Sequence, residues 1–290
     1  VTRYNPDAEI FHIFRANRNK IDALQDDIIQ ASYLDPQGNV WIGTHAGGVS
    51  KYSPGLIRFE HIKANPGSTT SLLSDGIFSI AEGENGQIWF GTIGGGTSVL
   101  DPITRDYSSF TSDDSEVDWS WNYISKILPI SESSIWLGTF RCGFFHLNPK
   151  TGKLTLYANE DIVPTSFSDH TVYALLKDSE GTIWIGTETQ GLDRFNKETS
   201  SFTHFKHIPE DSSSIGSNQI YALLEDHMGY IWIGTGGYGL SRMDNRDNSF
   251  THIGVKQKGE MGLSGNNVLC LYEDPDNNLW VGTRGAGLNR

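Results

Sequence analysis

The side chains in this sequence that are best suited to bind a polar ligand lie in short loops that follow a recurring Gly-Thr pair. The loops differ in sequence while the residues on either side of them recur, which is how a scaffold presents a recognition surface. Their charged, amide, imidazole and phenol groups can exchange hydrogen bonds with a hydroxyl-rich ligand. The candidate ligand-binding residues in these loops are His45, Arg141, Glu188, Gln190, Tyr238 and Arg284.

Lys126 is a further candidate because it breaks a repeated pattern of small residues. It lies ten residues before a recurring Trp, where the other repeats have Ala31, Ser79, Ala174, Ala222 and Cys270. Its ammonium group is expected either in a central channel, where it would attract an acidic or hydroxyl-rich ligand, or in solvent on an irregular repeat. The sequence leaves both alternatives open.

His170 is the exceptional member of a polar column that lies fourteen residues before each recurring Trp. The other members are Asp27, Asp75, Asn122, Asn218 and Asn266. Asp and Asn at the start of a strand often accept hydrogen bonds from nearby backbone amides, so this structural role is expected for the column. His170 is kept as a ligand-binding candidate, although an isolated His is more often a hydrogen-bonded structural residue.

Two tryptophans outside the main repeat offer aromatic faces on which a sugar could stack. Trp119 belongs to a column that is apolar in every repeat and is therefore expected in the core. Trp121 belongs to no column and is the better candidate.

The sequence contains no catalytic motif. It has no GxSxG, no HExxH and no cluster of histidines, so we expect neither an enzyme nor a bound metal or cofactor. Isolated histidines can still act in a lyase without forming such a motif, so His45 and His170 leave a lyase as an alternative.

The elements that position these residues are organised around a pentad of aliphatic residue, Trp, apolar residue, Gly and Thr. Successive tryptophans are 48, 47, 48, 48 and 48 residues apart, which is the regularity of a repeat protein. The six copies are Val40–Thr44, Ile88–Thr92, Ile135–Thr139, Ile183–Thr187, Ile231–Thr235 and Leu279–Thr283.

Each repeat predicts four short strands. An alternating run such as residues 220–226 leads through a turn such as Asp226–Gly229 into the pentad strand. These turns lack the alternating carboxylates of a calcium loop, so they are interpreted as hairpins. A glycine that recurs in every repeat then precedes a third strand, and an Asx-centred turn leads to a fourth. A polar loop, anchored by one apolar residue seventeen before each Trp, leads to the next repeat.

This pattern predicts an all-β fold, a β-propeller of four-stranded antiparallel blades that forms a single domain over residues 1–290. Each Trp is expected to wedge between neighbouring blades, and the basic residues Lys51, Arg194 and Arg242 are expected to belong to the framework. Both ends of the chain match the third strand of a repeat. The first two strands could therefore complete the last blade of a six-bladed ring, or the chain could be a segment of a seven-bladed one.

Charge and composition exclude several classes of partner. The net charge of −13 would repel nucleic acid phosphates and anionic lipid head groups. No run of 18 apolar residues is present, so we predict no membrane contact by this segment. The two cysteines exclude a disulfide framework but do not decide the compartment.

The pentad, the strand Gly191–Asn196 and the approach Glu225–Trp232 together resemble the two-component regulator propeller repeat, which differs from WD40 and kelch repeats. The resemblance implies the periplasmic sensor region of a membrane-bound receptor with a histidine-kinase or diguanylate-cyclase output module. It also implies oligosaccharide ligands and a homodimer formed through the parent receptor. We therefore predict a ligand-sensing propeller, with a structural or dimerisation scaffold as the first alternative and a lyase as the second.

Overall fold

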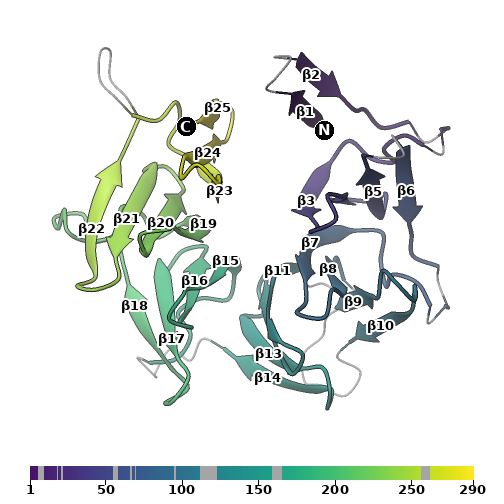
Figure 1. Ribbon diagram of the computed structural model, residues 1–290. Coiled ribbons are helices and arrows are strands. Elements are labelled where there is room, and N and C mark those ends of the chain that lie inside the picture. Colours follow the sequence, from purple (N-terminus) through teal and green to yellow (C-terminus); the bar gives the residue numbers. More distant parts are fainter. Residues whose placement is uncertain are drawn as a thin grey trace. The chain divides into compact units, whose positions relative to one another are not determined.

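The repeat of the sequence is a repeat of antiparallel sheets. The computed structural model describes residues 1–5, 10–17, 19–20, 22–54, 58–65, 67–68, 70–94, 96–111, 123–158, 165–255 and 262–290 (Figure 1). The chain divides into two compact units, Val1–Leu137 with Leu147–Leu154 and Gly138–His146 with Thr155–Arg290. The prediction of a single domain is not tested by this division. None of the described residues forms a helix long and apolar enough to cross a membrane.

The first three repeats form three four-stranded sheets whose strands pair in chain order. A separate two-stranded sheet precedes them, formed by β1 (Thr2–Asn5) and β2 (Ile10–Ile13). The first sheet contains β3 (Ile29–Leu34), β4 (Val40–Thr44), β5 (Val49–Ser53) and β6 (Arg58–Ile62). The second contains β7 (Ile77–Glu82), β8 (Ile88–Thr92), β9 (Thr97–Leu100) and β10 (Tyr107–Phe110). The third contains β11 (Ile124–Ser131), β12 (Ser134–Thr139), β13 (Phe144–Asn148) and β14 (Lys153–Tyr157).

The last three repeats form two four-stranded sheets and one three-stranded sheet. The fourth sheet contains β15 (Val172–Lys177), β16 (Ile183–Thr187), β17 (Leu192–Asn196) and β18 (Ser201–Phe205). The fifth contains β19 (Ile220–Glu225), β20 (Tyr230–Thr235), β21 (Leu240–Asp244) and β22 (Ser249–Ile253). The sixth contains β23 (Val268–Glu273), β24 (Leu279–Thr283) and β25 (Gly287–Asn289). The predicted four-strand repeat is confirmed in five of these sheets.

Within each unit, the pentad Trp packs against the following sheet. Trp41 of β4 shares a buried cluster with Ile77 of β7 and Phe90 of β8. Trp184 of β16 does the same with Ile220 of β19 and Ile233 of β20. Both indoles are almost completely buried. The predicted wedge between neighbouring blades is confirmed at these two positions.

A carboxylate six residues before the Trp holds the indole in place. The indole N–H donates to Asp35, Asp178, Asp226 or Asp274 at 2.7–2.9 Å in the first, fourth, fifth and sixth sheets. The same carboxyl group accepts the backbone N–H that closes the hairpin, from Thr182 at 2.7 Å in the fourth sheet. The acidic turns are therefore hairpins, as predicted. Their Asp residues have a second role that the turn pattern does not predict, as acceptors for the indole N–H.

The pKa of Asp35 shows which effect decides the charge state of this buried carboxyl group. Desolvation by burial acts to raise the pKa, but hydrogen bonds from Asn39 and Trp41 and the nearby Lys51 charge outweigh it. The net shift is downward, so Asp35 is ionised at neutral pH and accepts charge-assisted hydrogen bonds.

The loop after each pentad is closed by one side-chain hydrogen bond. The Thr hydroxyl donates to the carbonyl of the recurring Gly four residues later in all six copies, at 2.8–2.9 Å. That Gly has a positive φ in all six loops, as in Gly191 at +92°. A Cβ atom on Gly191 would also lie 2.3 Å from the carbonyl oxygen of Phe205. Glycine is therefore required here for both conformation and space.

The apolar residues seventeen before each Trp anchor the long loops as predicted. Leu24, Leu72, Phe167, Ile215 and Leu263 are all buried, at 5% exposure or less. Trp119, the remaining member of the column, lies outside the described residues.

We expect Gly191→Ala to lower the free energy of unfolding more than Gly181→Ala. Both glycines have positive φ, but nothing lies within 4 Å of a Cβ atom at Gly181. The Gly181 variant should cost about 1 kcal/mol through backbone strain alone, and the Gly191 variant about 1–3 kcal/mol more through the clash. Urea denaturation of the two variants measures the difference, and equal losses would contradict the packing argument.

Asp178→Ala should destabilise the protein by about 3 kcal/mol, because it leaves the buried indole N–H of Trp184 and two turn amides without their acceptor. Asp211→Ala is the control, since Asp211 is an exposed turn residue bonded to Ser213. The control should change the unfolding free energy much less, because Asp211 is exposed and its loss leaves no buried group without a partner. A similar loss in both variants would show that the indole hydrogen bond is unimportant.

Candidate functional site

The candidate site begins at an irregularity that recurs in the first strand of five sheets. The register between the first and second strands shifts once, at Val172/Ala174 in the fourth sheet and Ile220/Ala222 in the fifth. The same shift occurs in the first, second and sixth sheets. A β-bulge of this kind leaves one residue unpaired and re-aims its side chain. In the fourth and fifth sheets the extra residue is Tyr173 and Tyr221.

These two tyrosines lie together because the first strands of neighbouring sheets are adjacent. β15 lies beside β19, and β19 lies beside β23. The rings of Tyr173 and Tyr221 are 5.2 Å apart between centroids, and Phe140 packs edge-on against Tyr173 at 5.4 Å. Both tyrosines are partly exposed. The result is a row of three aromatic rings that solvent can reach.

Two charged groups from the loops complete this row. The Tyr173 hydroxyl donates to Glu188 Oε1 at 2.9 Å, and the Arg284 guanidinium lies 5.7 Å from the Tyr221 ring centroid. Glu188 and Arg284 follow directly after the Gly-Thr pairs of the fourth and sixth repeats. We call Phe140, Tyr173, Glu188, Tyr221 and Arg284 the tyrosine surface. All five residues belong to the second unit.

The loops that carry these charged residues are fixed to the start of the first strand. The backbone N–H of Glu188 donates to Thr171 at 3.2 Å, and that of Arg284 donates to Asn267 at 2.9 Å. The buried carboxylate of Asp169 also accepts from the Thr189 amide and hydroxyl at 2.7 and 2.9 Å. The side chains therefore project from a rigid frame.

Burial raises the pKa of the Tyr173 phenol well above its usual range, and the hydrogen bond to Glu188 and the Glu188 charge add to the increase. Tyr173 is thus a neutral hydrogen-bond donor at neutral pH. The tyrosine surface offers aromatic faces, a carboxylate acceptor and a guanidinium donor. These are groups that bind a neutral or acidic hydroxyl-rich molecule.

The other predicted site residues of the second unit are not part of the tyrosine surface. Arg141 is exposed and has φ of +73°, and His170 is exposed. Gln190 accepts a hydrogen bond from Lys206 at 2.8 Å. Tyr238 is 46% exposed and packs against His207 and His252, with centroids 5.9 and 5.6 Å away. Neither histidine was singled out in the sequence.

The polar column fourteen residues before each Trp acts on the backbone, as expected. Asp27, Asp75 and Asn218 accept hydrogen bonds from the amides of Ala16, Ala64 and His207 at 2.7–2.8 Å. The carbonyl of His170 accepts from Gly143 at 2.8 Å.

In the first unit, His45 is exposed and its amide donates to Ile28 at 3.0 Å. Lys126 is exposed on β11. Trp121 and Asn122 lie outside the described residues.

The predicted framework role of the strand cations fits their contacts. Lys51, Arg194, Arg242 and Arg290 each lie over the pentad Trp of their own sheet, 4.7–5.9 Å from the ring centroid. Among the described residues, no group of three or more His, Cys, Asp and Glu side chains is placed to hold a metal ion.

Sequence comparison identifies the family. The two component regulator propeller model matches residues 23–46, 71–94, 166–189, 214–237 and 262–285. The chain therefore belongs to the two-component regulator propeller family. No curated protein sequence matches it.

Solved structures assign the fold. The extracellular domain of the hybrid two component system BT3049 from Bacteroides thetaiotaomicron aligns with a TM-score of 0.81 and 22% identity, over 97% of this chain and 36% of that one. The corresponding domain of BT4673 from the same organism gives 0.60 and 18%, over 93% and 41%. The chain thus spans little more than a third of the length of these domains. The predicted β-propeller is confirmed, and of the two blade numbers that the sequence left open it has six, in small, mostly four-stranded sheets.

A lyase shares the fold at greater sequence distance. Virginiamycin B lyase from Staphylococcus aureus aligns with a TM-score of 0.64 and 13% identity, over 96% of this chain and 86% of the lyase. This likeness extends to the fold alone. The predicted lyase residues His45 and His170 belong to different units.

The raised pKa of Tyr173 predicts a loss of stability at high pH. A phenol whose folded pKa exceeds its unfolded value of about 10 stabilises the fold below that value, and this contribution disappears as the pH rises through the folded pKa. The free energy of unfolding should therefore begin to decrease as the pH rises above about 10, and it should decrease less steeply in Tyr173→Phe. Tyr238→Phe, which removes an exposed hydroxyl, should follow the wild type. An identical pH dependence in all three proteins would contradict the assignment.

Proposed function

We propose that this chain is a ligand-sensing propeller from the extracytoplasmic part of a membrane-bound two-component receptor. Membership of the regulator propeller family supports this role, as does the likeness to extracellular domains of hybrid two-component systems. The net charge of −13 agrees with a partner other than nucleic acid or an anionic membrane. The periplasm is the proposed location, and homodimer formation is proposed to occur through the parent receptor.

We further propose that the ligand is an oligosaccharide and that it binds at the tyrosine surface. The carrying observation is that bulges in two adjacent strands place Tyr173 and Tyr221 side by side with Glu188 and Arg284 at the row's edges. An aromatic face with nearby charged hydrogen-bonding groups matches a sugar ring, which has apolar C–H faces and a hydroxyl rim. None of the five residues of the tyrosine surface is repeated in every blade, unlike the pentad Trp and the loop Gly.

Two other functions remain as outcomes of the test. A structural or dimerisation scaffold would bind no oligosaccharide, and a lyase would degrade its ligand during the titration. The lyase alternative rests on a shared fold and on His45 and His170, so the sensor is favoured.

The test is calorimetric titration of the chain with a panel of neutral and acidic oligosaccharides. For a sugar that binds, Tyr221→Ala and Arg284→Ala should each weaken affinity about tenfold or more, because a stacked ring or a charged hydrogen bond contributes on the order of 1.4 kcal/mol. Tyr238→Ala is the matched control, since it removes an exposed tyrosine from the separate His207/His252 cluster, and it should leave affinity unchanged.

Unchanged affinity in the Tyr221 and Arg284 variants would remove the tyrosine surface as the site. Silence across the whole panel would favour the scaffold, and turnover would favour the lyase.

A further inference from the structure

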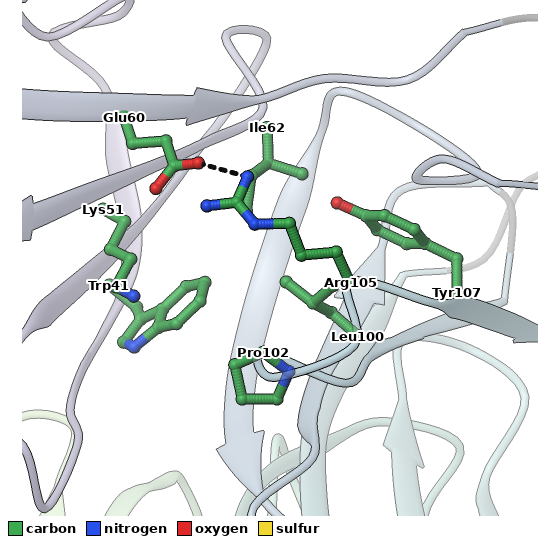
Figure 2. Close-up of a pocket in the computed structure, with 8 residues that line it drawn as sticks. All are labelled: Trp41, Lys51, Glu60, Ile62, Leu100, Pro102, Arg105 and Tyr107. Atoms are coloured by element: carbon green, nitrogen blue, oxygen red, sulfur yellow. Dashed lines mark ion pairs between the residues drawn. The ribbon is translucent and has the colours of Figure 1, made fainter.

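A pocket between the first and second sheets contains two charged residues, Glu60 and Arg105, that the fourth and fifth sheets lack at the matching positions. It has a volume of about 120 Å³ and lies within the first unit. Its walls are Trp41, Ile62, Leu100, Pro102 and Tyr107, and its charged groups are Lys51, Glu60 and Arg105. Figure 2 shows the Arg105 side chain extended across this pocket toward Glu60, with the Trp41 indole and the Tyr107 ring on either side. We call it the Arg105 pocket.

Arg105 occupies a backbone position for which arginine is poorly suited. It has φ of +66° in the turn between β9 and β10. The same turn position is Gly152, Ser200 and Asn248 in the next three sheets, also with positive φ. Glycine and asparagine are the residues that tolerate this conformation best. A long charged side chain at a strained position that smaller residues fill elsewhere is a reason to look for a function.

The repeats show what the ordinary partner of this position is. Between the fourth and fifth sheets, Arg194 Nη1 donates to Asn248 Oδ1 at 3.2 Å. The partner of the strand cation there is therefore a neutral amide in the turn of the next sheet. Between the first and second sheets, the matching residues are Lys51 and Arg105. Two cations cannot hydrogen-bond each other, so this interface has two positive charges where the other has one.

Glu60 supplies the carboxylate that meets Arg105. Its Oε1 lies 2.8 Å from Arg105 Nη1. Glu60 pairs across the strands with Lys51, and the matching residues of the fourth and fifth sheets are Thr203 and Thr251. The ion pair is open to solvent, with the Arg105 and Glu60 side chains 73% and 45% exposed. Such pairs are weak, so another carboxylate can compete for the guanidinium.

The two cations of the pocket differ in how well they are already balanced. Lys51 Nζ lies 4.7 Å from the Trp41 ring centroid, and its charge acts on Asp35, which holds the indole. Among the described residues, the exposed Glu60 is the one carboxylate that forms an ion pair with Arg105. Arg105 is therefore the less fully balanced of the two cations, and Lys51 adds to the positive potential.

We propose that the Arg105 pocket binds a small carboxylate with an apolar body. The ligand carboxylate replaces Glu60 on Arg105, in a bidentate geometry that guanidinium groups favour. Its apolar part lies against Trp41, Leu100 and Pro102. No residue of the tyrosine surface lines this pocket, so the inference is independent of the proposed oligosaccharide site.

The experiment compares butyrate with butyramide, which has nearly the same shape and no charge. Both are titrated by NMR at constant low ionic strength, because salt screens the charge. Butyrate should bind at least tenfold more tightly than butyramide. Arg105→Asn, which installs the residue found at Asn248, should weaken butyrate binding about tenfold. Glu60→Thr, which installs the residue found at Thr203 and Thr251, should strengthen it about two- to fivefold by removing the competitor.

Arg246→Asn is the control for a simple loss of positive charge, since Arg246 is an exposed turn residue of the fifth sheet paired with Asp244. It should leave butyrate affinity unchanged. Unfolding temperatures show whether each variant remains folded, and both Asn and Thr are residues that the chain already uses at the matching positions. Equal affinity for butyrate and butyramide, an unaltered Arg105→Asn variant, or an equal loss in Arg246→Asn would each overturn the proposal. Oligosaccharide affinity should not change in any of these variants, which separates this test from that of the tyrosine surface.

Discussion

The structure depends on the placement of a buried indole against a neighbouring sheet. A four-stranded sheet cannot bury both faces by itself, so Trp41 and Trp184 each enter a core formed with the next sheet. Burial would leave the indole N–H without a partner, at a cost of about 1–3 kcal/mol. The Asp six residues earlier removes that cost and closes the hairpin with the same carboxyl group. One side chain thus connects local turn geometry with packing between sheets.

The arrangement tolerates exceptions because several interactions act in each repeat. The second and third repeats have Gly83 and Ile130 where the others have Asp, yet Trp89 and Trp136 remain buried at 3% and 5% exposure. The Thr–Gly hydrogen bond is present in both. Stacking of Trp89 on Phe110, with centroids 5.5 Å apart, adds a contact within the second sheet. Loop closure and packing therefore maintain the repeat where the carboxylate is missing.

Much of the fold could be predicted because the same sequence pattern occurs in six repeats. The spacing of the tryptophans, the recurring glycines and the anchoring residues such as Leu24 and Ile215 each reappear in register, so chance patterns are averaged out. The paired Asp and Trp were visible as a constant spacing of six residues. Their hydrogen bond was missed because acidic turns are common for purely local reasons, and a pattern does not reveal which donor a carboxylate accepts.

The candidate site was less predictable for a physical reason. Glu188 and Arg284 stood out because variable loops on a constant frame are conspicuous. Tyr173 and Tyr221 were missed because they lie inside strands, where an aromatic residue fits an ordinary sheet position. Only the register shift at Val172/Ala174 and Ile220/Ala222 shows that these side chains are extra to the pairing. A bulge changes the direction of a side chain, but the residue types around it still predict an ordinary strand.

The same reasoning indicates where function is to be sought in a repeat fold. A residue that the scaffold needs appears in most copies, as the strand cations Arg194 and Arg242 do over their tryptophans. A residue that departs from its column and also carries charge or an aromatic ring is not explained by the scaffold. Arg105 meets that description at a strained backbone position, and Glu188 and Arg284 meet it in the variable loops. A residue of this kind can be replaced by the residue found at the matching position of another repeat. Such a variant keeps the repeat structure, so a change in ligand affinity then reports a binding role and not a structural one.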